Sequence, residues 1–425
     1  MTNKTYENLS ERLYLDTLPN GLAVYVLPRP DYARSFAFFA TNYGGAMRRF
    51  RLNGEPRDTP EGVAHFLEHK MFDMPDGNAL GTLSANGASP NAFTSSGITA
   101  YHFESTQGFD ENLHTLLNFV STPYFTAESV QKEQGIIGQE VRMTEDDPYF
   151  RVYNDLLRAL YAENPIRDSV VGTVESISHI SEKTLYDCHS AFYSPSNMVL
   201  CVAGGNDPES VLRIARETLP SEKAPVPEPD FGAPESELPL RARSEREMAV
   251  SAPQFMLGSK IKPAEKGRAL LRQKLVGSLS LRCLLGRSSP FYNGLYAEGL
   301  LRGDFDAEID YSAGTATFLA GGESANPEKV LERLCSEAAR IAQSGQDAAA
   351  FERARRAAYG SRLRGLEVFD NLCYDMALGH FGGYLSLDAF ELLPEITALE
   401  CEAFIAENIR PEKLSLSVVK PLTSA

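Results

Sequence analysis

The chain of 425 residues contains no tryptophan and only six cysteines, none of them in a C-x-x-C pair. The cysteines are scattered among apolar neighbours, so we expect buried free thiols and no disulfide framework. No stretch approaches the roughly 20 consecutive apolar residues that a membrane-spanning helix needs, and the polar start lacks the apolar core of a secretory signal. We therefore expect a cytoplasmic protein that has no membrane partner.

Positive charge is also in short supply. Lys and Arg number 41 against 57 Asp and Glu, which gives a formal net charge of −16. A chain this acidic is a poor default binder of nucleic acid, and it mildly favours basic peptides. The sequence also lacks the phosphate-loop motif G-x-x-x-x-G-K-[ST] and the nucleophile-elbow motif G-x-S-x-G. These absences leave nucleotide chemistry and serine-hydrolase chemistry without a motif.

What the chain does contain is an alternation of strand-like and helix-like patterns. Between Leu219 and Pro239, prolines and acidic residues dominate, and such a composition neither pairs well in a sheet nor propagates a helix. The sequence therefore predicts two α/β lobes of similar size, residues 1–220 and 240–425, joined by a proline-rich linker at 221–239. The expected strands include 22–27, 36–39 and 248–256, and the expected helices are at about 59–72, 110–120, 126–146, 150–162, 264–284 and 327–344.

The strongest chemical signal lies in the predicted helix at 59–72. Thr59, Pro60 and Glu61 are typical of a helix start, because Thr caps free amides, Pro tolerates the first turn and Glu favours the positive end of the helix dipole. His65 and His69 lie four residues apart, so both imidazoles project from one face, at a spacing that a single Zn²⁺ ion bridges. Glu68 lies beside them, where its carboxylate can reach a water molecule at the metal. This H-x-x-E-H order is the inverted zincin signature.

A catalytic zinc takes three protein ligands and leaves one position open, so a third ligand is expected elsewhere. The predicted helix at 126–146 carries Glu133 and Glu140, seven residues apart and therefore on one face. Alone, such a pair is usually a solvated helix face. Beside an H-x-x-E-H motif, it becomes a candidate for the missing ligand.

With these motifs in place, the sequence resembles the pitrilysin or insulinase-type zinc metallopeptidases, which include mitochondrial processing peptidase. The resemblance extends through NGLAVYVL near the start, the run from Asn91 to Thr94, GTVESI from Gly172 and YSPSNMVLCVAG from Tyr193, all in the family's order. It implies two related lobes, each a mostly antiparallel sheet packed with helices. It also implies that the zinc ligands are His65, His69 and Glu140, that Glu68 is the general base, and that Glu133 steadies a ligand histidine.

The resemblance also indicates how a substrate is held. The segment from Asn91 to Phe103 is similar to the family's strand beside the metal, whose open edge binds an extended peptide through main-chain hydrogen bonds. Asn91 and Ala92 are the candidate substrate contacts, although this run also suits an ordinary turn into a strand. We expect a zinc-dependent endopeptidase that cleaves extended peptides or unfolded segments.

The second lobe departs from the family. Family members commonly carry there an Arg followed seven residues later by a Tyr, which help to hold the substrate and the oxyanion. When the pattern is anchored on Gly299 and Leu300, these positions fall on Leu295 and Arg302. Half-length family members pair two chains, so we expect a heterodimer with a related chain that supplies the Arg and the Tyr. A homodimer, a structural or scaffold subunit, and a peptide-binding carrier with a non-catalytic zinc are the alternatives.

Overall fold

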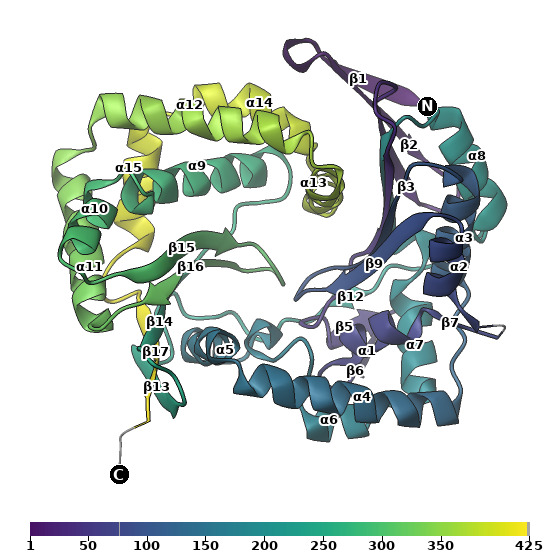
Figure 1. Ribbon diagram of the computed structural model, residues 1–425, viewed down its shortest axis with the longest axis horizontal. Helices are drawn as coiled ribbons and strands as arrows, with labels where there is room; N and C mark the ends of the chain where they lie inside the picture. The colour runs from purple at the N-terminus through teal and green to yellow at the C-terminus, as the bar shows by residue number, and fades with distance from the viewer. Residues whose placement is uncertain (76, 423–425) are drawn as a thin grey trace. The chain divides into compact units, whose positions relative to one another are not determined.

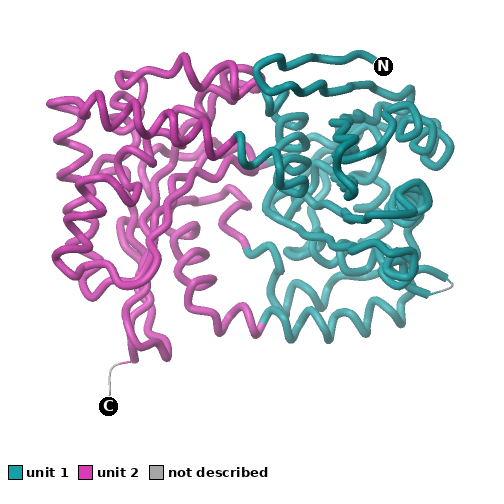
Figure 2. The backbone as a smooth tube through the Cα atoms, turned by 45° about the horizontal axis from the view of Figure 1, so that its top comes forward, with its two compact units in different colours: residues 1–141, 169–230, 363–387 teal, residues 142–168, 231–362, 388–425 magenta. Residues whose placement is uncertain are grey.

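The computed structural model describes residues 1–75 and 77–422. The chain divides into two compact units, coloured separately in Figure 2. Unit 1 comprises residues 1–141, 169–230 and 363–387, and unit 2 comprises residues 142–168, 231–362 and 388–425. The units are interleaved along the chain, whereas the sequence pattern predicts two continuous lobes.

Unit 1 contains a seven-stranded sheet in the order β1-β2-β3-β11-β4-β10-β9. The β3 and β11 strands pair in parallel, and every other neighbouring pair is antiparallel. All residues of β4 and β11 are buried, because helices cover both faces of the centre of the sheet. The strands are β1 (Thr2–Tyr6), β2 (Glu11–Thr17), β3 (Ala23–Pro28), β4 (Ser35–Thr41), β9 (Ala88–Thr94), β10 (Thr99–Ser105) and β11 (Met198–Gly204).

The two faces of this sheet are covered by different helices (Figure 1). On one face, Tyr101 of β10 packs edge-on against Phe119 of α3. On the other, Phe38 of β4 packs against Tyr374 of α13. The helices of unit 1 are α1 (Val63–Lys70), α2 (Ala79–Ala85), α3 (Phe109–Ser121), α6 (Val174–Ser178), α7 (Glu182–Phe192), α8 (Pro208–Thr218) and α13 (Phe369–Gly382), together with most of α4 (Ala127–Asp146).

Unit 2 contains a five-stranded sheet in the order β13-β17-β14-β16-β15. Its first pair is parallel and the rest are antiparallel. Its strands are β13 (Arg243–Met248), β14 (Gln254–Ile261), β15 (Arg302–Asp310), β16 (Ala316–Glu323) and β17 (Ser415–Pro421), and its helices include α5 (Pro148–Leu160), α9 (Arg268–Leu285), α10 (Pro290–Ala297), α11 (Pro327–Ser344), most of α12 (Ala348–Gly365), α14 (Ala389–Leu392) and α15 (Ala398–Asn408).

The two sheets repeat one topology. The last five strands of the unit 1 order, β3-β11-β4-β10-β9, have the same sequence of parallel and antiparallel pairings as β13-β17-β14-β16-β15 in unit 2. In each unit, two helices precede the edge strand: α1 and α2 before β9, and α9 and α10 before β15. The expected fold, two mixed α/β lobes with mostly antiparallel sheets, is confirmed. The edge strands β9 and β15 are topological equivalents.

Some expected elements differ in detail. The proline-rich segment forms one short strand, β12 (Glu228–Pro229), which pairs with β5 (Arg49–Leu52), and the Asp230 amide then donates to the Arg49 carbonyl. The prediction that this segment takes no part in a sheet is therefore wrong. The expected strand at 248–256 is also wrong, because those residues span the end of β13, a turn and the start of β14. The smaller strands are β6 (Glu55–Asp58), β7 (Asp73–Met74) and β8 (Gly77–Asn78).

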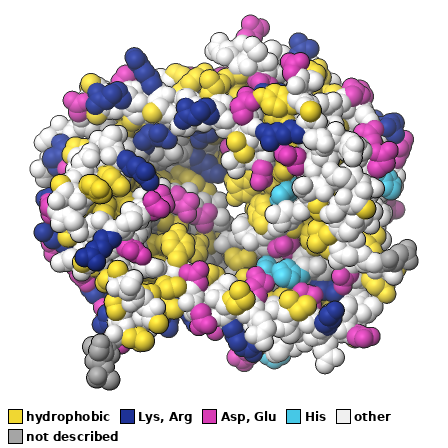
Figure 3. Space-filling view, in the orientation of Figure 1, with side chains coloured by type: hydrophobic (Ala, Val, Ile, Leu, Met, Phe, Trp, Pro, Cys, Tyr) yellow, Lys and Arg dark blue, Asp and Glu magenta, His cyan; other side chains and the backbone are white. Residues whose placement is uncertain are grey.

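Side-chain chemistry elsewhere agrees with the composition. All six cysteines are free thiols, and only Cys283 and Cys335 are not fully buried. Acidic and basic side chains are interspersed on the face shown in Figure 3. Within the described part of the chain, no helix combines the length and the apolar character needed to cross a membrane.

Candidate metal centre

The helix that carries the H-x-x-E-H motif is fixed at its start by a glycine. α1 begins at Val63 after Gly62, which has a φ of 88°. A Cβ at this position would lie 2.6 Å from Ile177 Cδ1 and 2.8 Å from the Val171 carbonyl oxygen, so only glycine fits. The prediction that Thr59 caps the helix is wrong, because its hydroxyl donates to the Arg48 carbonyl at 3.0 Å. The close approach of Gly62 to residues 171–177 sets the direction of α1.

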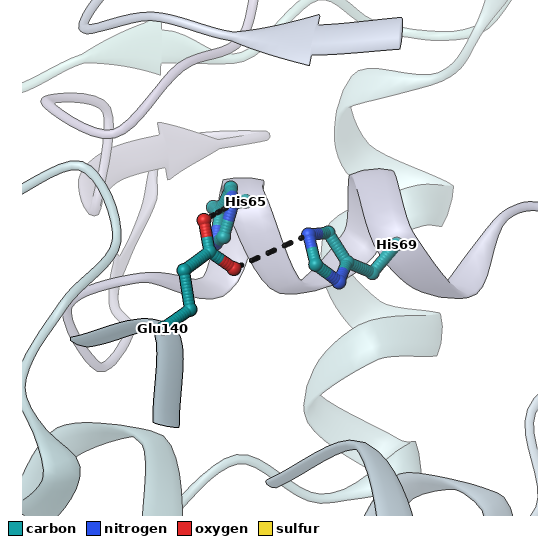
Figure 4. A group of neighbouring side chains, drawn as sticks. All are labelled: His65, His69 and Glu140. Carbon is teal, nitrogen blue, oxygen red and sulfur yellow. Dashed lines mark ion pairs between the residues drawn. The ribbon is translucent and has the colours of Figure 1, made fainter. Parts of the chain in front are cut away.

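One face of α1 brings the two histidines together. The ring centroids of His65 and His69 are 4.6 Å apart, and His65 is only 7% exposed. The Nε2 atom of His65 lies 3.4 Å from Glu140 Oε1, and the Nε2 atom of His69 lies 3.6 Å from Glu140 Oε2 (Figure 4). The expected spacing of the histidines is thus realised, and both Nε2 atoms face the same carboxylate.

The carboxylates come from α4, as expected. One potential ligand atom from each of His65, His69 and Glu140 lies within 4.8 Å of the others. Glu133, two turns earlier on α4, holds the opposite nitrogen of His69, with 3.0 Å between its Oε1 atom and Nδ1. This contact leaves the Nε2 atom of His69 pointing toward Glu140, so Glu133 orients the ring.

Titration of the cluster reflects these contacts. The hydrogen bond from His69 is the main cause that lowers the pKa of Glu133, and the hydrogen bond from His65 is the main cause that lowers the pKa of Glu140. Burial disfavours charge on His69, but its hydrogen bond to Glu133 and the charges of Glu68, Glu140 and Glu133 outweigh burial and raise its pKa. An excess of negative charge therefore surrounds the imidazoles, which suits a bound cation.

The donor set fits a catalytic zinc site. Two imidazole nitrogens and one carboxylate oxygen are typical zinc ligands, and three protein ligands leave a position for a fourth group. The contact between Glu133 and His69 supplies the outer carboxylate that metal-binding histidines commonly have. Among the described residues, no other group of His, Cys, Asp and Glu meets the same geometric requirement.

Glu68 lies on the same helix but outside this set. It is half-buried, and its Oε2 atom accepts a hydrogen bond of 3.0 Å from the Thr94 hydroxyl of β9. Its second carboxylate oxygen is not held by this bond. The H-x-x-E-H motif predicts Glu68 but not Thr94, because nothing in the run Asn-Ala-Phe-Thr indicates which of its side chains turns toward the motif.

The expected substrate strand, β9, is at the edge of the unit 1 sheet, and among the residues that the structure describes it pairs only with β10. Asn91 is exposed and Ala92 is half-buried, and the Ala92 amide donates to the Asn91 side-chain oxygen at 2.9 Å. An amide bonded to its own neighbour's side chain points away from the β10 ladder. Pro90 lies two residues before Ala92, so its backbone nitrogen faces the same open side of the strand. Proline has no N–H group to donate, which is the usual reason for proline at an open edge.

Two histidines outside the motif make structural contacts. The Nε2 atom of His189 donates to the Val120 carbonyl at 2.9 Å, and burial lowers the pKa of this histidine to about 4. His102 stacks among Phe36 and Phe38 of β4, and burial lowers its pKa. Neither histidine approaches the cluster on α1.

In unit 2, the two positions at which family members commonly carry Arg and Tyr hold other residues, and these two residues differ in their exposure to solvent. Leu295 is fully buried on α10, and Arg302 opens β15 with an exposed side chain. Tyr296, one residue beyond Leu295, is 69% exposed. The buried apolar side chain of Leu295 offers no polar group to a substrate.

Comparisons with known proteins agree with this site. A family model described as insulinase, peptidase family M16, matches residues 54–174, and one described as the peptidase M16 inactive domain matches residues 179–358. The chain is 37% identical to the uncharacterized zinc protease YmfH of Bacillus subtilis, over 98% of both chains.

Solved structures give the same grouping. An M16-like peptidase from Alicyclobacillus acidocaldarius is 35% identical, with a TM-score of 0.92 over 97% of this chain and 98% of that one. A chain of complex III from Candida albicans is 14% identical, with a TM-score of 0.76 over 96% of this chain and 95% of that one, which shows the fold alone.

Proposed function

The chain belongs to the insulinase family of peptidases, peptidase family M16, and we propose that it is a zinc-dependent endopeptidase that cleaves extended peptides or unfolded segments. The observation that carries this proposal is the convergence of His65, His69 and Glu140 within 4.8 Å, with Glu133 on the far nitrogen of His69. The similarity to a relative named as an uncharacterized zinc protease also supports it.

In this proposal, His65, His69 and Glu140 hold the metal. Bound zinc would polarise the scissile carbonyl and lower the pKa of a water molecule. Glu133 keeps His69 in the tautomer whose Nε2 atom is free to bind, because its carboxylate accepts a hydrogen bond from the Nδ1–H group. The assignment of each role rests on the distances among these four side chains.

Glu68 is the general base. Its carboxylate takes a proton from the attacking water and returns it to the leaving amine nitrogen, so the net reaction consumes one water molecule for each peptide bond. One carboxylate oxygen is held by Thr94, and the other is left to meet the water. Glu68 stays outside the ligand set because a base must be free to exchange a proton.

The open edge of β9 holds the substrate backbone. An extended peptide added to this edge gains main-chain hydrogen bonds irrespective of its side chains, which suits an enzyme for unfolded segments. The Ala92 amide is one such donor, and the Asn91 side chain now occupies it. A bound peptide therefore has to displace or share the Asn91 oxygen.

We further propose that the chain works as a heterodimer with a related chain that lacks H-x-x-E-H and carries the Arg and Tyr. The buried Leu295 supports this proposal, because unit 2 of this chain has no Arg at that position. A homodimer is the competing arrangement. Full peptidase activity of the purified chain without a second gene product would contradict the proposed heterodimer, but it would not contradict the proposed endopeptidase function.

The second candidate function is a structural or scaffold subunit of the same fold, and the likeness to a complex III chain is what favours it. The substitution Glu68→Gln separates the two functions. In an endopeptidase, purified alone or with its related partner, it leaves one zinc per chain and reduces hydrolysis of fluorogenic peptides by about 100- to 10,000-fold. A scaffold subunit would hydrolyse nothing before or after the substitution.

A further inference from the structure

The hydroxyl of Thr94 contacts Glu68 in a way that the H-x-x-E-H motif does not require. Thr94 is the last residue of β9, and its Oγ1 atom lies 3.0 Å from Glu68 Oε2. An ionised carboxylate only accepts hydrogen bonds, so the Thr94 hydroxyl is the donor. A hydrogen bond to a charged acceptor is stronger than one between neutral groups.

A second threonine lies beside Thr94. Thr99 of β10 lies directly opposite Thr94 in the strand register and is fully buried. Its single hydroxyl proton goes to the Tyr43 carbonyl at 2.9 Å, and its Oγ1 atom lies 3.3 Å from Thr94 Oγ1. Between the Thr99 oxygen and the closer carboxylate of Glu68, the charged group is the stronger acceptor, so the Thr94 proton is directed to Glu68.

The contact that orients Glu68 comes from Thr94. The hydroxyls of Tyr101 and Tyr193 form a hydrogen bond of 2.9 Å with each other, and both rings are buried. Burial raises the pKa of both phenols, and the charge of Glu68 also contributes. The two phenols are bonded to each other, whereas the Thr94 hydroxyl is bonded to the carboxylate of Glu68.

We infer that Thr94 is a positioning residue: it holds one oxygen of Glu68 so that the other faces the water in the reaction, and it ties the base to the strand that binds the peptide. The inference rests on the proposed endopeptidase function. Asn91, Ala92 and Thr94 lie within four residues of one edge strand. A peptide that pairs with β9 would therefore be in a fixed register with the base that acts on it.

The test compares Thr94→Val, which keeps the shape but removes the donor, with Thr94→Ser, which keeps the donor. We expect Thr94→Val to lower kcat about 10- to 100-fold while KM changes by less than about twofold and zinc content stays at the wild-type value. Thr94→Ser should restore kcat to within a few-fold of wild type. Thr2→Val is the matched control, since Thr2 of β1, at the opposite edge of the same sheet, donates to the Leu15 carbonyl of β2.

A crystal structure of Thr94→Val supplies a readout that does not depend on activity. The Glu68 carboxylate should leave its wild-type position in this variant and keep it in Thr94→Ser. An unchanged kcat in Thr94→Val, a joint loss of zinc and kcat, or a Ser variant as impaired as the Val variant would each overturn the inference. If the wild-type chain cleaves no peptide either alone or with its related partner, the proposed function fails, and an unmoved Glu68 in Thr94→Val then overturns the positioning role separately.

Discussion

The edge strands β9 and β15 occupy the same place in two sheets of the same order, but their chemical surroundings differ. β9 lies beside α1, which carries His65 and His69, whereas β15 follows α9 and α10, which carry no histidine. All seven histidines of the chain belong to unit 1. β15 instead carries acidic residues at alternate positions, Asp304, Asp306, Glu308 and Asp310.

The acidic groups of the two units respond to their neighbours in opposite ways. Glu133 and Glu140 accept hydrogen bonds from histidines, which lower their pKa values. The pKa of Glu308 shifts the other way: burial, followed by the charges of Asp310 and Asp306, raises it. Neither the sheet topology nor a group of carboxylates is therefore sufficient for a candidate metal centre. The histidines of α1 distinguish unit 1, since they bring Glu133 and Glu140 into one cluster with them.

The largest effect is expected from removing a histidine. In His69→Ala, the metal loses one of three ligands and Glu133 loses its partner, so zinc content should fall to background and peptidase activity with it. Metal analysis after gel filtration measures the zinc content, and a fluorogenic peptide assay measures the peptidase activity. Glu308→Gln on β15 is the matched change in unit 2 and should leave both unchanged. A His69→Ala protein that keeps its full zinc content would contradict the claim that the histidines of α1 distinguish unit 1 from unit 2.

A smaller loss is expected when the support of His69 is weakened. Glu133→Gln keeps the size of the side chain but removes the negative charge that holds Nδ1, so zinc affinity or activity should fall about 10- to 100-fold. Competition with a chromogenic chelator measures the affinity. A variant with wild-type affinity and activity would show that Glu133 is an ordinary helix-surface acid.

The edge of β9 gives a still smaller effect. Ala92→Pro removes the outward amide, and the loss of one hydrogen bond worth about 0.5–1.5 kcal/mol should lower kcat/KM roughly 2- to 12-fold. Zinc content and the melting temperature serve as controls for folding. Unchanged kcat/KM in a well-folded variant would indicate that the peptide does not pair with this edge at Ala92.

The smallest effect concerns the stability of unit 2. A carboxyl whose pKa is raised on folding binds more protons in the folded state, so stability falls as pH rises from the unfolded value near 4.5 through the raised value. Glu308→Gln removes this titration and should flatten the fall, with its advantage present above that window and absent below it. Urea unfolding between pH 4 and 8 measures the difference, and parallel wild-type and variant curves would contradict the raised pKa.

Much of the centre could be predicted from the sequence because it depends on helical periodicity. The spacing of His65 and His69, and that of Glu133 and Glu140, places each pair on one face wherever the helix lies. The contact between α1 and α4, by contrast, depends on tertiary packing, which the sequence pattern does not give. The start of α1 also depends on tertiary packing: the helix begins after Gly62 and not at the expected cap Thr59, because the chain at Gly62 passes close to residues 171–177.

The other elements of the fold also divide into those that periodicity predicts and those that depend on tertiary contacts. Long amphipathic helices such as α4 and α11 lie close to their expected ranges, since one buried face suffices to define them. The pairing of β12 with β5 was not predictable, because a two-residue ladder leaves no hydrophobic period. The bond from Thr94 to Glu68 was equally hidden, since it joins two elements through a single hydroxyl.

The most direct test of the account is a crystal structure of the zinc-loaded chain with anomalous data collected above and below the zinc absorption edge. The account predicts one strong difference peak, about 2.0–2.2 Å from the Nε2 atoms of His65 and His69 and from a Glu140 oxygen, with Glu68 outside the ligand set. A peak ligated by Glu68, a peak among the acids of β15, or no peak at α1 in a chain that binds zinc would contradict it.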